Sequence, residues 1–119
     1  MTSHRVLIAL GSNHCQPVFI QWASQRMGVL LDNPQYSDIM WTKDIKGSGR
    51  MYMNRLVAGT TLLSVCEIEQ KLKEIEAEAH RTSEQVTIDL DLMQYDTERY
   101  HLRDWPRPYI VNLLGKLQV

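Results

Sequence analysis

The sequence predicts an α+β fold in which one antiparallel sheet packs against two helices on one of its faces. Three patterns lead to this prediction: an apolar run near the N-terminus, an amphipathic helical stripe in the middle and an alternating run after residue 85. At 119 residues, with 44% hydrophobic and 23% charged residues, the chain has the length and composition of a globular domain. We therefore expect residues 1–119 to form a single domain.

The first third of the chain predicts a strand, a helix and a second strand. Residues 5–10 are apolar on both faces, as in a central strand covered on both sides, and the Gly-Ser-Asn of residues 11–13 ends this run. Pro17 suits the first turn of a helix, and the loosely helical pattern that follows stops at the Asp-Asn-Pro turn signal of residues 32–34. Residues 36–45 then have an extended pattern.

The middle of the chain predicts a third strand and the clearest helix. A Lys-Gly-Ser-Gly loop at residues 46–49 precedes a strand at residues 51–58. The Gly-Thr-Thr at residues 59–61 offers a cap for a helix that begins at Leu62. The apolar positions of this helix recur every three or four residues and form one stripe: Val65, Ile68, Leu72, Ile75 and Ala79.

The alternating run at residues 86–93 completes the order of elements. One face of this strand carries Val86, Ile88, Leu90 and Leu92, and the other carries Thr87, Asp89, Asp91 and Met93. The resulting order β-α-β-β-α-β is the ferredoxin-like one, an antiparallel sheet with helices on one face. Residues 99–109 are rich in rings, charges and prolines, which is typical of binding loops, and residues 110–117 fit a short helix or a strand.

Composition argues against nucleic-acid and membrane partners. A net charge of −1 provides no basic surface for nucleic acid or anionic lipid. No apolar run approaches the roughly 20 residues of a membrane helix, and the N-terminus lacks the apolar core of a signal peptide. The two cysteines, Cys15 and Cys66, do not make a disulfide framework, so we interpret them as reduced thiols and expect a cytoplasmic protein.

Asp89 and Asp91 carry the clearest chemical signal in the chain. Residues i and i+2 of a strand lie about 6.6 Å apart, so the two carboxylates can share divalent cations. Mg²⁺ favours sites with one or two carboxylates, several waters and phosphate oxygens of a substrate. Aspartate is poorly suited to strand interiors, so two on one face need a reason. The alternative is the solvated face of an ordinary amphipathic edge strand.

Four segments together resemble one enzyme family. They are Ala9-Leu10-Gly11-Ser12-Asn13, Tyr52-Met53-Asn54, the helix from Ile75-Glu76 to Arg81, and Thr87-Ile88-Asp89-Leu90-Asp91-Leu92-Met93. Their order and the predicted fold resemble hydroxymethyldihydropterin pyrophosphokinase, the folate-pathway enzyme that moves a pyrophosphoryl group from ATP to a pterin alcohol. The resemblance extends from about Val6 to about Leu114.

The resemblance implies roles for five charged or ionisable residues of the expected site. Asp89 and Asp91 would bind two Mg²⁺ ions that hold the phosphates of the co-substrate ATP, an arrangement suited to in-line displacement. Arg81 and Arg107 match phosphate-facing arginines, whose planar forks bind phosphate oxygens in pairs, and His101 matches a histidine near the triphosphate. Two alternatives stay open, because Arg81 also suits the dipole at a helix C-terminus and His101 also suits an exposed surface.

The resemblance also implies a pterin held between aromatic rings and recognised at its edge by an amide. Tyr52, Asn54 and Tyr109 match this pattern, and Thr42 is a weaker match. Tyr52 fits ordinary strand packing equally well. Asn54 is more informative, because asparagine is disfavoured in the middle of a strand.

The chain departs from the family pattern before the carboxylate strand. The family usually has a longer loop there, with a tryptophan and further arginines, whereas here only residues 82–86 intervene and Val86 occupies the place of a phosphate-contacting arginine. Loss of those cations would remove stabilisation of transition-state charge. Two hypotheses follow. The first is an Mg²⁺-dependent pyrophosphokinase acting on a pterin and ATP, favoured by the two carboxylates. The second is a non-catalytic homologue that binds pterin or nucleotide or partners another folate enzyme, favoured by the missing arginines.

Overall fold

The computed structural model describes residues 2–117 and contains, within that range, six strands and three helices. In chain order they are β1 (His4–Ser12), α1 (Gln16–Leu30), β2 (Asp32–Tyr36), β3 (Met40–Lys43), β4 (Met51–Thr61), α2 (Val65–Glu78), β5 (Asp89–Tyr95), β6 (Glu98–Arg99) and α3 (Pro108–Gly115). Among these residues no helix is both long enough and apolar enough to span a membrane.

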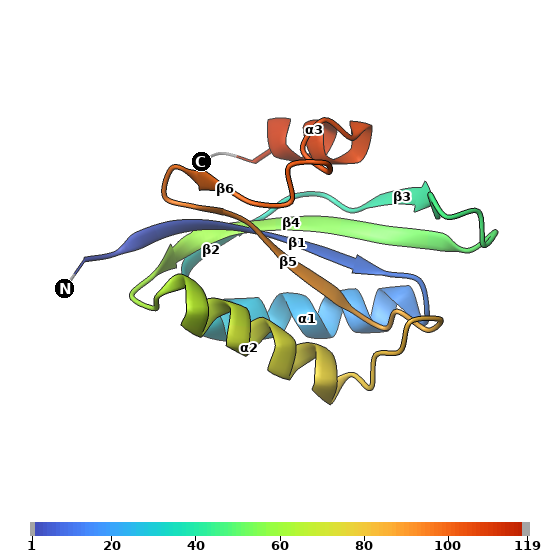
Figure 1. Cartoon of the computed structure of the whole chain (residues 1–119), viewed down its shortest axis with the longest axis horizontal. Helices are drawn as coiled ribbons and strands as arrows, with labels where there is room; N and C mark the ends of the chain where they lie inside the picture. The colour runs from blue at the N-terminus through green and yellow to red at the C-terminus, as the bar shows by residue number, and fades with distance from the viewer. Residues whose placement is uncertain (1, 118–119) are drawn as a thin grey trace.

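All strand pairs in the described range are antiparallel, and the strands form one sheet (Figure 1). The strand order is β2-β4-β1-β5-β6, and β3 pairs with β4 along a different part of that strand from β2. The predicted α+β class with an antiparallel sheet is therefore confirmed. The observed chain has more strands than the predicted β-α-β-β-α-β order. The predicted extended segment at residues 36–45 contains β3, β2 precedes it in the region predicted as a turn, and the short β6 follows β5.

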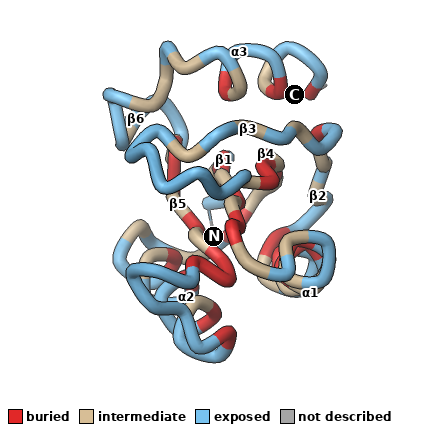
Figure 2. The backbone as a smooth tube through the Cα atoms, turned by 90° about the vertical axis from the view of Figure 1, so that its right-hand side faces the viewer, coloured by how far each residue is buried: buried red, intermediate tan, exposed pale blue. Residues whose placement is uncertain are grey.

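Helices cover both faces of the sheet, with α1 and α2 on one side and α3 on the other (Figure 1). Ile8 and Leu10 of β1 pack in the cluster that includes residues of α1 and α2, whereas Leu7 packs with Ile110 and Leu113 of α3. The buried residues accordingly lie in the interior on both sides of the sheet (Figure 2). The prediction that helices cover one face is correct for α1 and α2 and wrong for α3. The reason is that the second face also presents apolar side chains, which α3 buries.

The segment predicted as a turn at residues 32–34 instead begins β2. Asp32 pairs with Thr60 and Gln35 with Ala58, and the register shifts between these two pairs. Asn33 lies inside this irregularity with φ of 49°, a left-handed conformation that asparagine tolerates. The Asp-Asn-Pro sequence therefore encodes a bulge within a strand.

The helix predicted to begin at Leu62 begins three residues later. Thr61 still pairs with His4 at the end of β4, so the cap lies further along the chain at Ser64. The Ser64 hydroxyl accepts a hydrogen bond from the Glu67 backbone N–H at 3.2 Å, and the Glu67 side chain accepts one from the Ser64 N–H at 3.0 Å. This reciprocal capping box sets the start of α2.

We expect Ser64→Ala to lower the free energy of unfolding by about 1 kcal/mol, because the first turn of α2 loses the hydrogen bond that its cap supplies. Urea denaturation of the parent and the variant measures this difference. Ser3→Ala, at an exposed position outside the helices, is the control and should unfold like the parent. Equal stability of the parent and Ser64→Ala would show that the capping box contributes nothing measurable.

Candidate active site

A cavity of about 570 Å³ opens at the end of the sheet where β1 finishes and where β4 and β5 begin. It is lined by parts of β1, β3, β4 and β5, by the β3–β4 loop, by the segment between α2 and β5, and by the start of α3 with the segment before it. All the site residues expected from the sequence line it except His101: Thr42, Tyr52, Asn54, Arg81, Asp89, Asp91, Arg107 and Tyr109.

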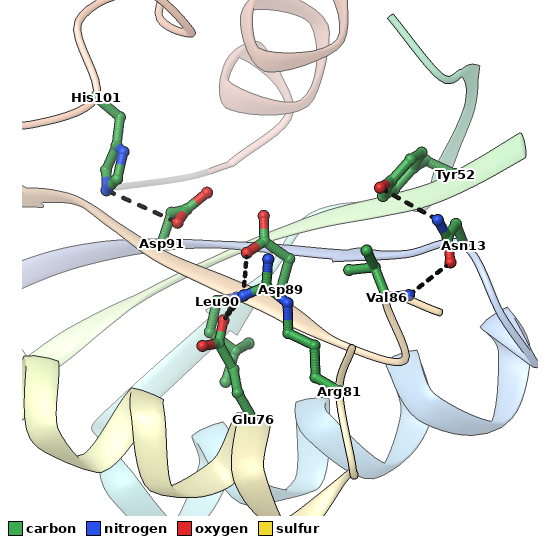
Figure 3. Close-up of polar contacts among 9 residues, drawn as sticks. All are labelled: Asn13, Tyr52, Glu76, Arg81, Val86, Asp89, Leu90, Asp91 and His101. Atoms are coloured by element: carbon green, nitrogen blue, oxygen red, sulfur yellow. Dashed lines mark hydrogen bonds and ion pairs between the residues drawn. The ribbon is translucent and has the colours of Figure 1, made fainter. Parts of the chain in front are cut away.

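Asp89 and Asp91 project from the face of β5 opposite α1 and α2. On β1, Asp89 pairs with Gly11 and Asp91 with Ala9, so both carboxylates lie beside the last part of that strand (Figure 3). Leu90, between them in the sequence, packs in the core cluster with α1 and α2. The predicted alternation is confirmed from Ile88 to Met93. It is wrong for Val86, which lines the cavity, because regular strand pairing begins only at Asp89.

The surroundings of Asp91 disfavour its negative charge. Partial burial, followed by the neighbouring charge of Asp89, raises the pKa of the Asp91 carboxyl to about 8. Glu76 and Asp104 act in the same direction. The nearest basic group within residues 2–117 is His101, whose Nε2 lies 3.7 Å from the Asp91 carboxylate. A divalent cation bound here would relieve this repulsion, and carboxylates are the oxygen ligands that Mg²⁺ prefers.

Arg81 joins the end of α2 to the beginning of β5. Its Nη1 lies 3.0 Å from the Glu76 carboxylate and 3.1 Å from the Asp89 carboxylate (Figure 3). Glu76 also accepts a hydrogen bond from the Leu90 N–H at 2.8 Å, and burial is the main cause of its raised pKa. The guanidinium therefore pairs with carboxylates, which goes beyond a helix-dipole role.

The wall formed by β3 and β4 carries an oriented amide. Asn54 is 6% exposed, and its Nδ2 donates hydrogen bonds to Thr42 Oγ1 at 2.9 Å and to the Met40 carbonyl at 3.0 Å. No donor among residues 2–117 bonds to the Asn54 side-chain oxygen, so this oxygen can accept a bond from a ligand. Thr42, the weaker match in the sequence, thus lies next to Asn54 and helps to fix its amide.

Two tyrosines complete the cavity. Burial, with the charge of Asp104 next in importance, raises the pKa of Tyr109 to about 12. Burial, followed by the charge of Asp44, also raises the pKa of Tyr52. Both phenols are therefore neutral near pH 7, and both rings can stack on a flat ligand.

Asn13 is a site residue to which sequence reasoning gave no role. Its backbone N–H donates to the Val86 carbonyl at 2.9 Å, and its side-chain oxygen accepts from the Val86 N–H at 2.8 Å (Figure 3). Its Nδ2 donates to the Tyr52 hydroxyl at 3.3 Å. The Gly-Ser-Asn motif gave a signal for this position, but its contacts with Val86 and Tyr52 depend on the folded chain.

Asp104 was also missed, and it lies beside His101 and Asp91. Ligand atoms of these three residues all lie within 4.8 Å of one another, so they form a second group able to hold a metal ion. A turn in which the Asp104 N–H bonds to the His101 carbonyl at 2.9 Å brings both side chains to Asp91. Arg107 pairs with Asp104 through its Nε at 2.7 Å. His101 is thus near the carboxylates although it does not line the cavity.

Comparison with known proteins identifies one family. The model of the family described as 7,8-dihydro-6-hydroxymethylpterin-pyrophosphokinase (HPPK) matches residues 7–118, which is nearly the whole chain. No curated protein matches the sequence.

In metal-free protein we expect Asp91→Asn to flatten the pH dependence of stability. The raised pKa means that the folded chain keeps this proton to higher pH than the unfolded chain, where aspartate titrates near about 4. The stability associated with protonated Asp91 is therefore complete below about pH 4 and is lost as the pH rises through about 8. Urea denaturation in EDTA at several pH values between about 5 and 9 measures the slope.

The control is Asp38→Asn, because the Asp38 side chain is 75% exposed and does not line the cavity. It should keep the slope of the parent, whereas Asp91→Asn should lose part of it. If the parent and Asp91→Asn show the same slope, Asp91 does not carry this pH dependence.

Proposed function

Because the chain belongs to the 7,8-dihydro-6-hydroxymethylpterin-pyrophosphokinase family, we propose that it transfers pyrophosphate from ATP to hydroxymethyldihydropterin in folate biosynthesis, with Mg²⁺ required. The observation that carries this proposal is that one cavity is lined both by Asp89 and Asp91 and by Tyr52, Asn54 and Tyr109. A volume of about 570 Å³ lies within the range of roughly 300–1,000 Å³ usual for small-molecule sites.

Asp89 and Asp91 are the residues that would hold Mg²⁺. The charge repulsion at Asp91 and the all-oxygen donor set support this assignment. When bound, Mg²⁺ ions neutralise phosphate charge and stabilise the charge that develops on the leaving oxygen. We propose that two ions bind. His101 and Asp104, which lie beside Asp91, are further candidate ligands.

Arg81, Arg107 and His101 are proposed to face the phosphates. The contact between Arg81 and Asp89 holds a guanidinium beside the proposed metal ligand, where phosphate oxygens would also lie. Arg107 lines the same cavity from the segment that leads into α3. Guanidinium donors fixed in this way bind phosphate oxygens without rearranging during the reaction.

The pterin is proposed to lie against the rings of Tyr52 and Tyr109, with its edge at Asn54. The hydrogen bonds from Asn54 to Thr42 and Met40 hold the amide, so its oxygen can accept from the donor groups on the edge of the heterocycle. The hydroxymethyl oxygen would then attack the β-phosphorus of ATP and release its proton to solvent. A new O–P bond forms, the bond from the β-phosphorus to the oxygen of AMP breaks, and AMP leaves.

We further propose a ferredoxin-like topology, a single domain and a cytoplasmic location. The strand order β2-β4-β1-β5 supports a ferredoxin-like relationship, and both core clusters support one domain over residues 1–119. The free cysteines Cys15 and Cys66 support a reducing compartment, for which we propose the cytoplasm.

The alternative is a non-catalytic homologue that binds pterin or nucleotide or partners another folate enzyme. It is favoured by the absence of lysine and arginine from residues 82–86. AMP release, measured with pterin, ATP and Mg²⁺ together and with each omitted, discriminates the two. AMP formed only in the complete mixture supports the enzyme, whereas pterin binding without AMP release supports the alternative.

We expect Asp89→Ala and Asp91→Ala to weaken Mg²⁺-dependent ATP binding by at least about tenfold and to abolish AMP release, because the metal loses its ligands. Calorimetry with a non-reactive ATP analogue and Mg²⁺ measures the binding. Asp38→Ala removes an exposed carboxylate elsewhere and should bind like the parent. Parent-like binding by both site variants would show that Asp89 and Asp91 do not bind the metal.

We expect Asn54→Leu to weaken pterin binding by more than about tenfold, because donors on the edge of the heterocycle lose their partner. Tyr109→Ala should weaken it as well, through lost stacking. Quenching of protein fluorescence by the pterin measures both affinities. Asn112→Leu, at an exposed position of α3, is the matched control. No quenching of the parent at pterin concentrations approaching millimolar would contradict the proposed pterin site.

A further inference from the structure

Both arginines proposed to face phosphate already have carboxylate partners. Arg81 pairs with Glu76 and Asp89, and Arg107 pairs with Asp104. Their positive charges are therefore partly compensated before any nucleotide binds. A triphosphate carries several negative charges, so a cation without a carboxylate partner would strengthen its binding beyond what Mg²⁺ supplies.

Arg50 meets this requirement. It lines the cavity from the β3–β4 loop, directly before β4, and it is exposed. Its Nη1 donates a hydrogen bond to the Glu84 backbone carbonyl at 2.7 Å, which is a neutral partner. Within residues 2–117 no carboxylate lies within 4.0 Å of its guanidinium. A guanidinium has five N–H donors, so most of them remain available to a ligand.

The surrounding loops hold Arg50 in place. The Asp44 N–H donates to the Arg50 carbonyl at 3.0 Å, which closes the base of the β3–β4 loop. The bond from the Arg50 side chain to Glu84 reaches the segment of residues 82–86, which contains no cation of its own. Lys43 and Lys46 also line the cavity, together with the acidic Asp44 and Glu84. Arg50 differs from these lysines because its planar fork can bind two phosphate oxygens at once.

We infer that Arg50 binds the triphosphate of the nucleotide and supplies the cation that the segment of residues 82–86 lacks. This inference rests on the proposed function, because it names a further residue of the same site. It assigns phosphate recognition partly to the β3–β4 loop, whereas the residues proposed to bind the pterin lie on β4 and α3.

The test is calorimetry with α,β-methylene-ATP and Mg²⁺ on the parent, Arg50→Gln and Arg50→Lys. We expect Arg50→Gln to weaken binding by at least about tenfold, because a charge-assisted, two-point contact is lost. Arg50→Lys should lie between Arg50→Gln and the parent, since it keeps the charge and loses the fork. Added salt should weaken binding by the parent more than binding by Arg50→Gln.

The matched control is Arg5→Gln, which removes the same charge from an exposed position at the other end of β1. It should bind the analogue like the parent. Pterin affinity, measured by fluorescence quenching, should be the same in the parent and Arg50→Gln. This second readout separates phosphate binding from a purely structural role, because a structural role would lower the affinity for both ligands.

Three results would overturn the inference. Parent-like affinity of Arg50→Gln for the analogue would show that Arg50 does not bind phosphate, and would leave the proposed function intact. An equal loss of pterin and nucleotide affinity in Arg50→Gln would assign Arg50 to loop structure. A parent that binds neither pterin nor the analogue would overturn the proposed function itself, and this inference with it.

Discussion

The register between β1 and β5 determines where the chemistry of this protein lies. Asp91 pairs with Ala9 and Asp89 with Gly11, so both carboxylates lie at the end of β1 that borders the cavity. A slip of one residue would turn the aspartates toward α1 and α2 and expose the leucines, because neighbouring strand residues point to opposite faces. Burial of Leu90 and Leu92 therefore fixes the position of two charged groups that contribute nothing to the core.

Asn13 continues the connection between β1 and β5 beyond the regular strand pairs. Its backbone and side chain both bond to Val86, which attaches the segment before β5 to the end of β1. Through its Nδ2 the same residue reaches Tyr52 on β4. One amide thus connects the half of the cavity that carries the carboxylates with the half that carries the aromatic rings. Because these groups are buried or partly buried, loss of one partner would leave another polar group unsatisfied, at a cost of about 1–3 kcal/mol.

Sequence patterns predict the parts of the site that depend on local geometry. The faces of Asp89 and Asp91 follow from strand alternation alone, and Asn54 stands out because asparagine is rare in a strand interior. Glu76 gives no such signal, since in the sequence it resembles any charged residue on the solvated side of a helix. Its role comes from the Leu90 N–H and from Arg81, contacts that exist only after α2 packs on β5.

The face covered by α3 could not be predicted for a related reason. Residues 110–117 are too short to separate a helix from a strand by period, and the side chains they bury lie on three different strands. Leu7, Leu56 and Met93 come together only when β1, β4 and β5 pair. Asp104 reaches Asp91 from the chain that leads into α3, so its place in the site could not be predicted either, whereas His101 was expected from the family resemblance.

Val86 carries no charge at the position where the family usually has a phosphate-contacting arginine, so other residues must supply the positive charge of this site. Its side chain is 6% exposed, and its backbone is bonded on both sides to Asn13, so this position belongs to the frame of the site. Its apolar side chain lines the cavity and supplies no positive charge there. Arg50 is exposed on the β3–β4 loop, lines the same cavity and does carry a positive charge. Stacking on a flat heterocycle requires fixed walls, which β4 and α3 supply through Tyr52 and Tyr109. Attraction of a highly charged phosphate chain depends mainly on the amount of nearby positive charge, which a loop can supply.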